Sequence, residues 1–290
     1  MDPLTPVKAL RRMLRRDRTW VPAGHFYSPI PEADEIRRNE ARIFDRSSGE
    51  IEGVALNAAG QLENVRAIGL FAGELPFPER SDDPNRYGFE NEFFSYGDAI
   101  FLYGMMRQHR PKRIIEIGSG HSSLVIAETN ERFFSGALEH TCVDPFPPTS
   151  TLARVPTLVR QNVQELSPEF FAGLEANDIL FVDSTHVAKT GSDVNFLIFH
   201  VLPRLKPGVL IHFHDIFYPF EYPEAWVYQG RAWNEGYLLR AFLQYNSQFR
   251  IELFNSYLYY FHHAELQRHV PLALRAVGAG LWLRRNKVTG

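Results

Sequence analysis

A short apolar segment that runs directly into a glycine turn and a helix is the feature that most constrains this chain. Residues 113–117 read Arg-Ile-Ile-Glu-Ile, and Gly118-Ser119-Gly120 follows at once. Over the next eight residues the apolar positions recur at helical spacing. Glycines let the backbone turn sharply and approach a ligand, and the amides at a helix N-terminus favour a negatively charged group. The pattern predicts one strand–turn–helix unit with a ligand at its turn.

Further short apolar segments extend this unit into a sheet. Helix-length or turn-rich segments separate them, which is typical of parallel strands joined by crossover connections. We therefore predict an α/β fold with a doubly wound, Rossmann-like sheet of seven strands. The sheet is mostly parallel with one antiparallel edge strand, and helices cover both faces. The expected strands are 113–117, 140–143, 157–160, 178–182, 208–212, 250–254 and 280–284.

The first third of the chain contributes none of these strands. Its elements are short and weakly periodic, so we predict an N-terminal extension over 1–90, helical and irregular, packed on a core domain of 91–290. Helices are expected at 1–20, 32–44 and 91–109. The first is basic and amphipathic and could touch a membrane surface, although packing on its own domain or on a second subunit is favoured.

Composition and charge exclude several classes of protein. The 290 residues are 44% hydrophobic and 22% charged with a net charge of -3, which excludes a fibre or a disordered chain and gives no general attraction to nucleic acid. The single cysteine, Cys142, excludes an internal disulfide and a CxxC motif. Neither a membrane span nor a signal peptide is recognisable. We expect a cytoplasmic protein without a nucleic-acid partner, with a homodimer as an open alternative.

Polar residues follow several of the expected strands. Asp144 follows the second strand, Asp183 the fourth, and His214-Asp215 the fifth. Ligands of such sheets lie beyond the carboxyl ends of the strands, where a carboxylate can accept both hydroxyls of a ribose. Each Asp alone could simply form a turn or cap. The coincidence of three such strand ends predicts a nucleotide-type crevice.

The glycine turn distinguishes between two cofactors of this fold. A dinucleotide fingerprint would carry Gly or Ala at the last position, where this chain has Ser123, and Glu116 would lie unfavourably close to a pyrophosphate. S-adenosylmethionine instead presents an ammonium and a sulfonium that carboxylates favour, and a carboxylate that suits the turn amides. The turn therefore favours S-adenosylmethionine.

Several motifs in chain order resemble the class I S-adenosylmethionine-dependent methyltransferases. They are the stretches 116–123 (Glu-Ile-Gly-Ser-Gly-His-Ser-Ser), Asp144-Pro145, 181–186 (Phe-Val-Asp-Ser-Thr-His), Lys206-Pro207-Gly208 and 212–216 (His-Phe-His-Asp-Ile). Two further stretches, Gly191-Ser192-Asp193-Val194-Asn195 and Trp233-Asn234-Glu235, resemble one bacterial branch that methylates small molecules.

The resemblance also implies roles for individual residues. Glu116, Gly118 and Gly120 would line the methionine end of the cofactor, Asp144 would hold the ribose, and Asn162 would lie near the adenine. We also place four neighbours among the cofactor-binding residues, with His121 either touching the cofactor or capping the helix: Ser119, His121, Ser122 and Asp183.

The loops after the fourth and fifth strands carry the candidate catalytic residues Asp183, His186, His214 and Asp215. Methyl transfer to a hydroxyl needs a positioned acceptor and removal of its proton. His186 with an ordinary pKa near 6.5 would serve as a general base for O-methylation of a small acceptor. Alternatively, Asp183, His214 and Asp215 would hold Mg²⁺, Mn²⁺ or Fe²⁺, in positions similar to those of metal-dependent O-methyltransferases.

Other functions remain open at this point. A metal-dependent oxygenase like the cephalosporin hydroxylases would use His214 as an iron ligand, and a non-catalytic subunit would bind the cofactor alone. His212 is predicted to be a hydrogen-bonded core residue and His262-His263 a surface feature. The aromatic stretch 213–233 is predicted to be an irregular flap over the crevice that suits a ring-bearing acceptor.

Overall fold

The computed structural model of the chain describes residues 20–287. All but the last residue of the helix predicted at 1–20 therefore lies outside the described residues. The chain divides into two compact units, one of residues up to 45 together with 223–232, the other of 46–222 together with 233 onward. The domain boundary at residue 90 stays a prediction.

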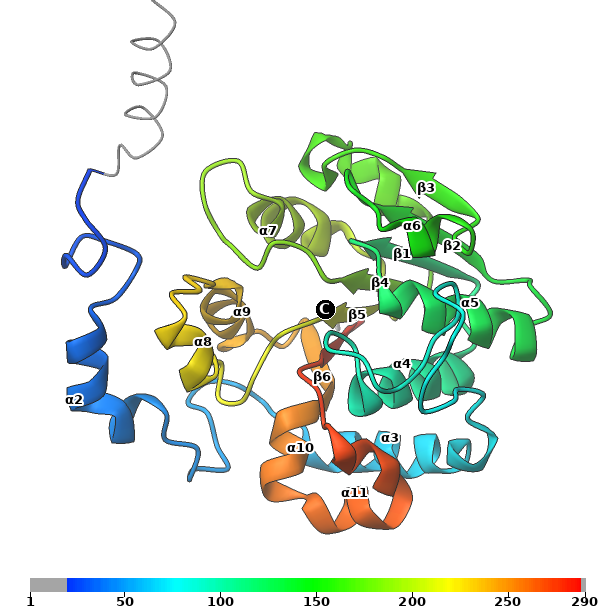
Figure 1. Cartoon of the computed structure of the whole chain (residues 1–290), viewed down its shortest axis with the longest axis horizontal. Coiled ribbons are helices and arrows are strands. Elements are labelled where there is room, and N and C mark those ends of the chain that lie inside the picture. The colour runs from blue at the N-terminus through cyan, green and yellow to red at the C-terminus, as the bar shows by residue number, and fades with distance from the viewer. Residues whose placement is uncertain (1–19, 288–290) are drawn as a thin grey trace, which may run out of the picture. The chain divides into compact units, whose positions relative to one another are not determined.

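A seven-stranded sheet forms the centre of the second unit (Figure 1). Its spatial order is β3-β2-β1-β4-β5-β7-β6. The first five strands are parallel, whereas β7 is antiparallel to β5 and to the outermost strand β6. The predicted seven-stranded, mostly parallel α/β sheet is confirmed. The strands are β1 (Arg113–Ile117), β2 (Glu139–Val143), β3 (Thr157–Val159), β4 (Ile179–Val182), β5 (Leu210–Phe213), β6 (Phe249–Phe254) and β7 (Leu281–Arg285).

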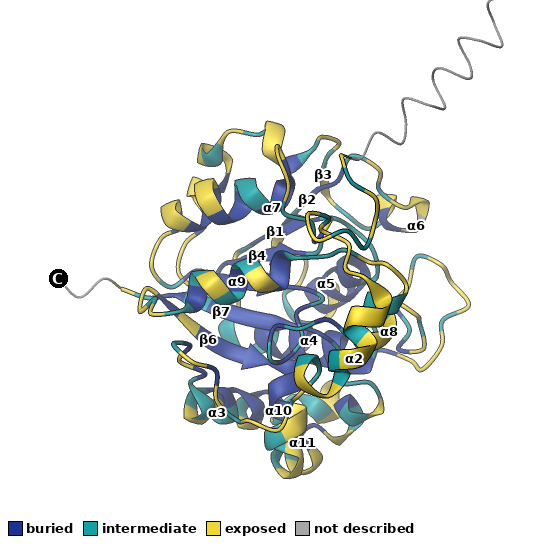
Figure 2. Ribbon diagram, turned by 90° about the vertical axis from the view of Figure 1, so that its left-hand side faces the viewer, coloured by how far each residue is buried: buried dark blue, intermediate teal, exposed yellow. Residues whose placement is uncertain are grey.

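Helices lie on both sides of the sheet, as predicted. Figures 1 and 2 show α3 and α11 on one side and α7 on the other. The helices of the second unit are α3 (Ala58–Gly69), α4 (Tyr96–His109), α5 (His121–Phe133), α6 (Thr149–Leu152), α7 (Asp193–Phe196), α9 (Glu235–Leu243), α10 (Asn255–Phe261) and α11 (His263–His269). The first unit contains α2 (Ala33–Ile43) and α8 (Glu224–Tyr228).

Helix α4 begins five residues later than predicted. The side-chain oxygen of Asn91 accepts hydrogen bonds from the amides of Phe93 and Phe94 at 3.1 and 2.7 Å. The carbonyl of Phe94 in turn accepts from the side-chain amide of Asn91 at 3.0 Å and from the hydroxyl of Tyr87 at 2.7 Å, so side chains occupy an acceptor that a helix would use. Phe93 and Phe94 are thereby held in a loop that leads into α4.

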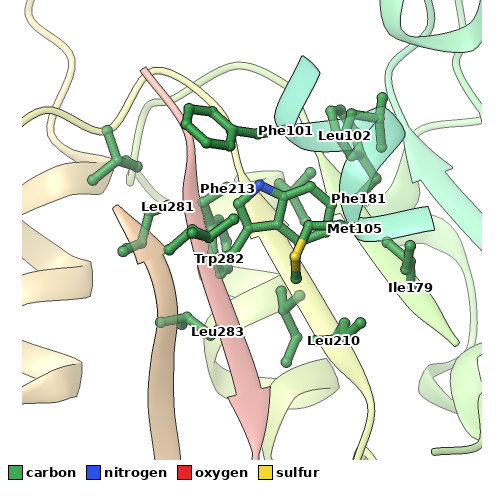
Figure 3. Packing of buried hydrophobic residues seen from close by; sticks show 14 of the residues in the cluster. Phe101, Leu102, Met105, Ile179, Phe181, Leu210, Phe213, Leu281, Trp282 and Leu283 are labelled. Carbon is green, nitrogen blue, oxygen red and sulfur yellow. The ribbon is translucent and has the colours of Figure 1, made fainter. Parts of the chain in front are cut away.

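The sheet is buried on both faces. All four residues of β4 are buried, which is typical of a central parallel strand, and Figure 2 shows the strands dark blue while the helices carry exposed yellow faces. Figure 3 draws the centre of the core, where α4 supplies Phe101 and Met105 and the strands supply Phe181 and Trp282. Packing on both faces fixes the strand ends, and these ends carry the polar residues.

Candidate active site

The parallel ladders bring the predicted strand-end residues together. The amide of Asp183 donates to the carbonyl of Ile117 at 3.0 Å, and the amide of His214 donates to the carbonyl of Val182 at 2.9 Å. Asp144 is bonded in the same way to the end of β3. These bonds continue the ladders one residue past β4, β5 and β2. The side chains therefore start from one edge of the sheet, where the strand order changes direction between β1 and β4.

Two neighbouring cavities lie at this edge, and both are lined by Ser119 and Asp183. The first has a volume of about 290 Å³ and the second of about 370 Å³. The first is lined by Ile117, Gly118, Ser119, Val143, Asp144, Pro145, Asn162, Val163, Gln164, Asp183, Ser184, Thr185 and Asp193. The second is lined by Phe93, Phe94, Ser119, Gly120, His121, Ser122, Leu124, Pro148 and Asp183.

The glycine turn forms the wall between β1 and α5. Gly118 has a φ of +89°, and a Cβ there would lie 2.0 Å from the carbonyl oxygen of Asp183, so only glycine fits. A Cβ at Gly120 would meet nothing within 4 Å. The hydroxyl of Ser119 donates to the carboxylate of Asp144 at 2.6 Å, and the amide of Phe146 donates to its other oxygen at 2.7 Å. The Asp144 carboxylate is thus oriented at the wall of the first cavity.

The carboxylate of Glu116 lies beneath α5 and not in either cavity. It accepts hydrogen bonds from the hydroxyls of Ser122 and Ser123 at 2.5 and 2.7 Å. It also pairs with His140 Nε2 at 2.8 Å and accepts from the thiol of Cys142 at 3.0 Å. We call these five residues the Glu116 cluster. It joins β1, β2 and the first turn of α5.

Two further predicted cofactor residues each line one of the cavities. Asn162 lines the first and donates its amide to Glu165 at 2.7 Å. His121 lines the second, where its ring stacks on that of Phe93 with 6.2 Å between centroids. Burial lowers the pKa of His121, and its Nδ1 has no hydrogen-bond partner among the described residues. His121 is therefore a neutral side chain that faces an aromatic ring.

The predicted catalytic residues meet at the ends of β4 and β5. His186 Nε2 lies 3.4 Å from Asp183 Oδ1 and 3.6 Å from Asp215 Oδ2, and one donor atom from each of the three lies within 4.8 Å of the others. We call these three residues the Asp183 cluster. His214 is next to it, with Nε2 3.7 Å from Asp215 Oδ1. The nearest set of donors thus contains His186 where we had predicted His214.

Carboxylates surround His186 and change its pKa. Burial alone would lower that pKa, but the carboxylates of Asp183 and Glu235 outweigh it and raise the pKa to about 10. Burial likewise acts to raise the pKa of Asp183, but the nearby His214 and His186 lower it overall. We had expected an ordinary histidine. With this charge distribution the imidazole of His186 carries a proton at neutral pH.

His212 occupies the core position that we predicted for it. Its ring stacks on that of Phe181 with 4.1 Å between centroids and lies 4.6 Å from that of Trp282. The predicted hydrogen bonds are absent, since both ring nitrogens lack a partner among the described residues. Burial lowers the pKa of His212 well below its usual range. Of the predicted surface pair, His263 is exposed, whereas His262 is half-buried with its Nε2 3.3 Å from the hydroxyl of Tyr257.

The segment Trp233-Asn234-Glu235, for which the sequence predicts no role, contacts His186. The carboxylate of Glu235 accepts from Nδ1 of His186 at 3.0 Å, although 49 residues separate the two in the chain. No periodicity or local spacing links residues so far apart, so only their resemblance to a family motif marked them. Residues 223–232 of the predicted flap belong to the other unit and contain α8. That the flap covers the crevice stays a prediction.

Comparisons with known proteins agree with this architecture. Residues 115–216, which run from β1 past β5, match a family model described as a methyltransferase domain. Over 166 residues the chain is 36% identical to an uncharacterized protein of Archaeoglobus fulgidus, covering 54% of this chain and 75% of that protein. Among residues 20–287, none of the helices combines the length and the hydrophobicity of a membrane-spanning segment. With its sheet topology and glycine turn, the chain belongs to the methyltransferase-domain family, among the class I S-adenosylmethionine-dependent methyltransferases.

Proposed function

We propose that this protein transfers a methyl group from S-adenosylmethionine to an oxygen atom of a small molecule. The observation that carries the proposal is the pair of cavities that meet at Ser119 and Asp183. One cavity has the polar lining that a nucleoside needs, and the other is lined by apolar and aromatic side chains. A cofactor in the first would face an acceptor in the second across Asp183.

The residues of the first cavity match the parts of the cofactor. The Asp144 carboxylate would accept the ribose hydroxyls, and Asn162 would lie near the adenine. The amides of the glycine turn and of the α5 N-terminus would receive the methionine carboxylate. Because the Glu116 carboxylate is buried beneath α5, its proposed role is to hold the turn through Ser122.

The second cavity favours a ring-bearing or hydrophobic acceptor. Phe93, Phe94, Leu124 and Pro148 supply apolar surface, and His121 adds a neutral aromatic face. Aromatic side chains pack favourably against planar rings, either stacked or edge to face. The acceptor oxygen would then point to the Asp183 cluster, where the polar groups of the site are concentrated.

The charge distribution favours metal assistance over an unaided histidine base. A general base must be unprotonated at working pH, whereas the carboxylates around His186 raise its pKa to about 10. Asp183 and Asp215 offer the oxygen donors that a divalent cation binds, beside an imidazole nitrogen. Such a cation lowers the pKa of an acceptor hydroxyl and orients it. Asp183 would then hold both the cation and the acceptor near the cofactor.

Calorimetric titration of the metal-free protein with S-adenosylmethionine and S-adenosylhomocysteine tests the cofactor assignment. We expect micromolar binding that Asp144→Ala weakens at least tenfold, because the variant removes the predicted ribose contact. Asp82→Asn, on an exposed loop of the same unit, is the matched control and should bind normally. Absence of binding to the unmodified chain would overturn the proposal. With binding established, phenols and other ring-bearing hydroxyl compounds are the first acceptors to screen.

A further inference from the structure

Three consecutive residues, Trp233, Asn234 and Glu235, all contact His186. The ring of Trp233 lies 4.5 Å from the imidazole between centroids, and the amides of Asn234 and Glu235 donate to the carbonyl of His186 at 3.1 and 3.2 Å. The Asn234 side chain also bridges the next turn of the loop, accepting from the amide of Ala188 at 2.6 Å. The segment therefore holds the loop after β4 through hydrogen bonds made by its own backbone amides and by the side chain of Asn234.

These hydrogen bonds also hold the backbone of His186 in an unfavourable conformation. Its φ is +59°, in the left-handed region that residues other than glycine rarely adopt. Holding a non-glycine residue there costs conformational free energy, which the surrounding contacts must offset. The hydrogen bonds from Asn234 and Glu235 to the His186 carbonyl can offset this cost. The backbone of His186, and with it the orientation of the imidazole ring, is therefore fixed by its neighbours.

Glu235 determines which nitrogen of His186 faces the site. The Glu235 carboxylate is completely buried and pairs with Nδ1 at 3.0 Å. Nε2 is thereby directed to Asp183 and Asp215, at 3.4 and 3.6 Å. Donors bound to one ion at about 2.0–2.2 Å lie roughly 3–3.5 Å apart. Nε2 is already close to that spacing from both carboxylates, and the three donor atoms lie within 4.8 Å of one another.

We propose that Trp233, Asn234 and Glu235 present His186 Nε2 as a third ligand, beside Asp183 and Asp215, for a divalent cation of the borderline class such as Zn²⁺ or Co²⁺. Histidines that bind metals usually donate their other N–H to a carboxylate, and Glu235 is placed for that. An imidazole nitrogen suits borderline ions better than Mg²⁺, which prefers oxygen. The inference deepens the proposed function, because it names the cation of the same acceptor site.

Metal binding to the full chain tests this without any acceptor. The chelator-treated protein is titrated with Co²⁺, followed by its visible absorption, and with Zn²⁺ and Mg²⁺ by calorimetry. We expect His186→Ala to weaken Co²⁺ and Zn²⁺ binding about 100-fold and to shift the Co²⁺ spectrum, because it removes a ligand. Glu235→Gln should weaken both about 10-fold, in the range seen for outer partners of ligating histidines. Mg²⁺ binding should change by less than threefold in either variant.

Two controls keep the outcomes separate. His263→Ala and Glu139→Gln change exposed residues of the same unit and should leave every titration unchanged. Binding of S-adenosylhomocysteine reports on the fold and on the proposed function, since neither His186 nor Glu235 lines the first cavity. If His186→Ala fails to fold, His186→Asn takes its place. Unchanged Co²⁺ affinity and spectrum in the histidine variant, or no Co²⁺ binding to the unmodified chain that still binds S-adenosylhomocysteine, would overturn the inference alone.

Discussion

Two groups of histidine and carboxylate lie near the ends of the parallel strands, and they differ in how their polar atoms are satisfied. In the Glu116 cluster, one buried carboxylate faces four donors of its own chain at 2.5–3.0 Å. In the Asp183 cluster, the histidine lies 3.4–3.6 Å from two carboxylates, one of them with 35% of its side chain exposed. The first group is closed by hydrogen bonds, whereas Asp183 of the second lines both cavities.

The difference separates a structural cluster from a functional one of the same residue types. Both sets of donors lie close enough to hold a metal ion. The Glu116 cluster is filled by its own hydrogen bonds, and an ion would have to displace buried bonds that each stabilise the fold. In the Asp183 cluster the carboxylates of Asp183 and Asp215 lie beside a protonated imidazole, and a cation bound there would displace that proton, so its binding should strengthen as the pH rises. Donor spacing alone would not have distinguished them.

Removal of the central carboxylate should have the largest effect and should separate the clusters. Glu116→Ala leaves buried donors without an acceptor, so we expect the free energy of unfolding to fall by about 3–5 kcal/mol. Asp183→Ala removes a carboxylate whose side chain is 35% exposed but which pairs with the buried His186, so we expect a smaller loss of about 1–2 kcal/mol. Urea unfolding followed by circular dichroism measures both. Equal losses would contradict the distinction.

The glycine turn between the clusters gives the next largest effect. A Cβ at Gly118 would overlap the Asp183 carbonyl, and φ is +89°, so Gly118→Ala should cost about 2–4 kcal/mol. It should also weaken binding of S-adenosylhomocysteine, because it moves the β1 turn away from β4. Gly120→Ala is the matched control, since its Cβ meets nothing within 4 Å, and it should cost less than about 1 kcal/mol. If the two variants unfold at the same urea concentration, the close approach of Gly118 to the Asp183 carbonyl does not limit which residue the turn accepts.

Much of the fold could be predicted from the sequence because its signals are local. The strand and turn at 113–120 and the apolar strand 179–182 depend on neighbours in the chain. The meeting of Asp183 and Asp215 followed as well, because parallel strands place their carboxyl ends at one edge.

The environment of each side chain could not be predicted in the same way. The contacts of Glu116 with His140 and Cys142 depend on the register of β1 against β2, in which Glu116 lies opposite Cys142. The approach of Glu235 to His186 depends on a connection of 49 residues. Burial and neighbouring charges at such contacts then determine the pKa of His186. That pKa therefore cannot be predicted from the identity of the residue alone.

The pH dependence of stability sharpens the comparison for the Asp183 cluster. A histidine whose pKa rises from 6.5 to about 10 on folding stabilises the fold fully below 6.5, and that stabilisation is lost as the pH rises toward 10. With chelator present, we expect the free energy of unfolding to fall by roughly 1–3 kcal/mol between pH 7 and 9. His186→Gln should remove most of this slope. If His186→Gln keeps the full dependence of the free energy of unfolding on pH, that dependence arises from other titratable groups.

The smallest expected effect concerns Cys142 in the Glu116 cluster. Its thiol donates to Glu116 at 3.0 Å, and burial, the main cause, raises its pKa. Cys142→Ser keeps a donor of similar size and should change the free energy of unfolding by less than about 1 kcal/mol, whereas Cys142→Ala loses the donor and should cost about 1–2 kcal/mol. Urea unfolding of the pair measures the difference. The thiol should also resist alkylation in the folded protein, because thiolate is the reactive form. Rapid alkylation under native conditions would mean that the Glu116 cluster opens to solvent, and the contrast with the Asp183 cluster would then fail.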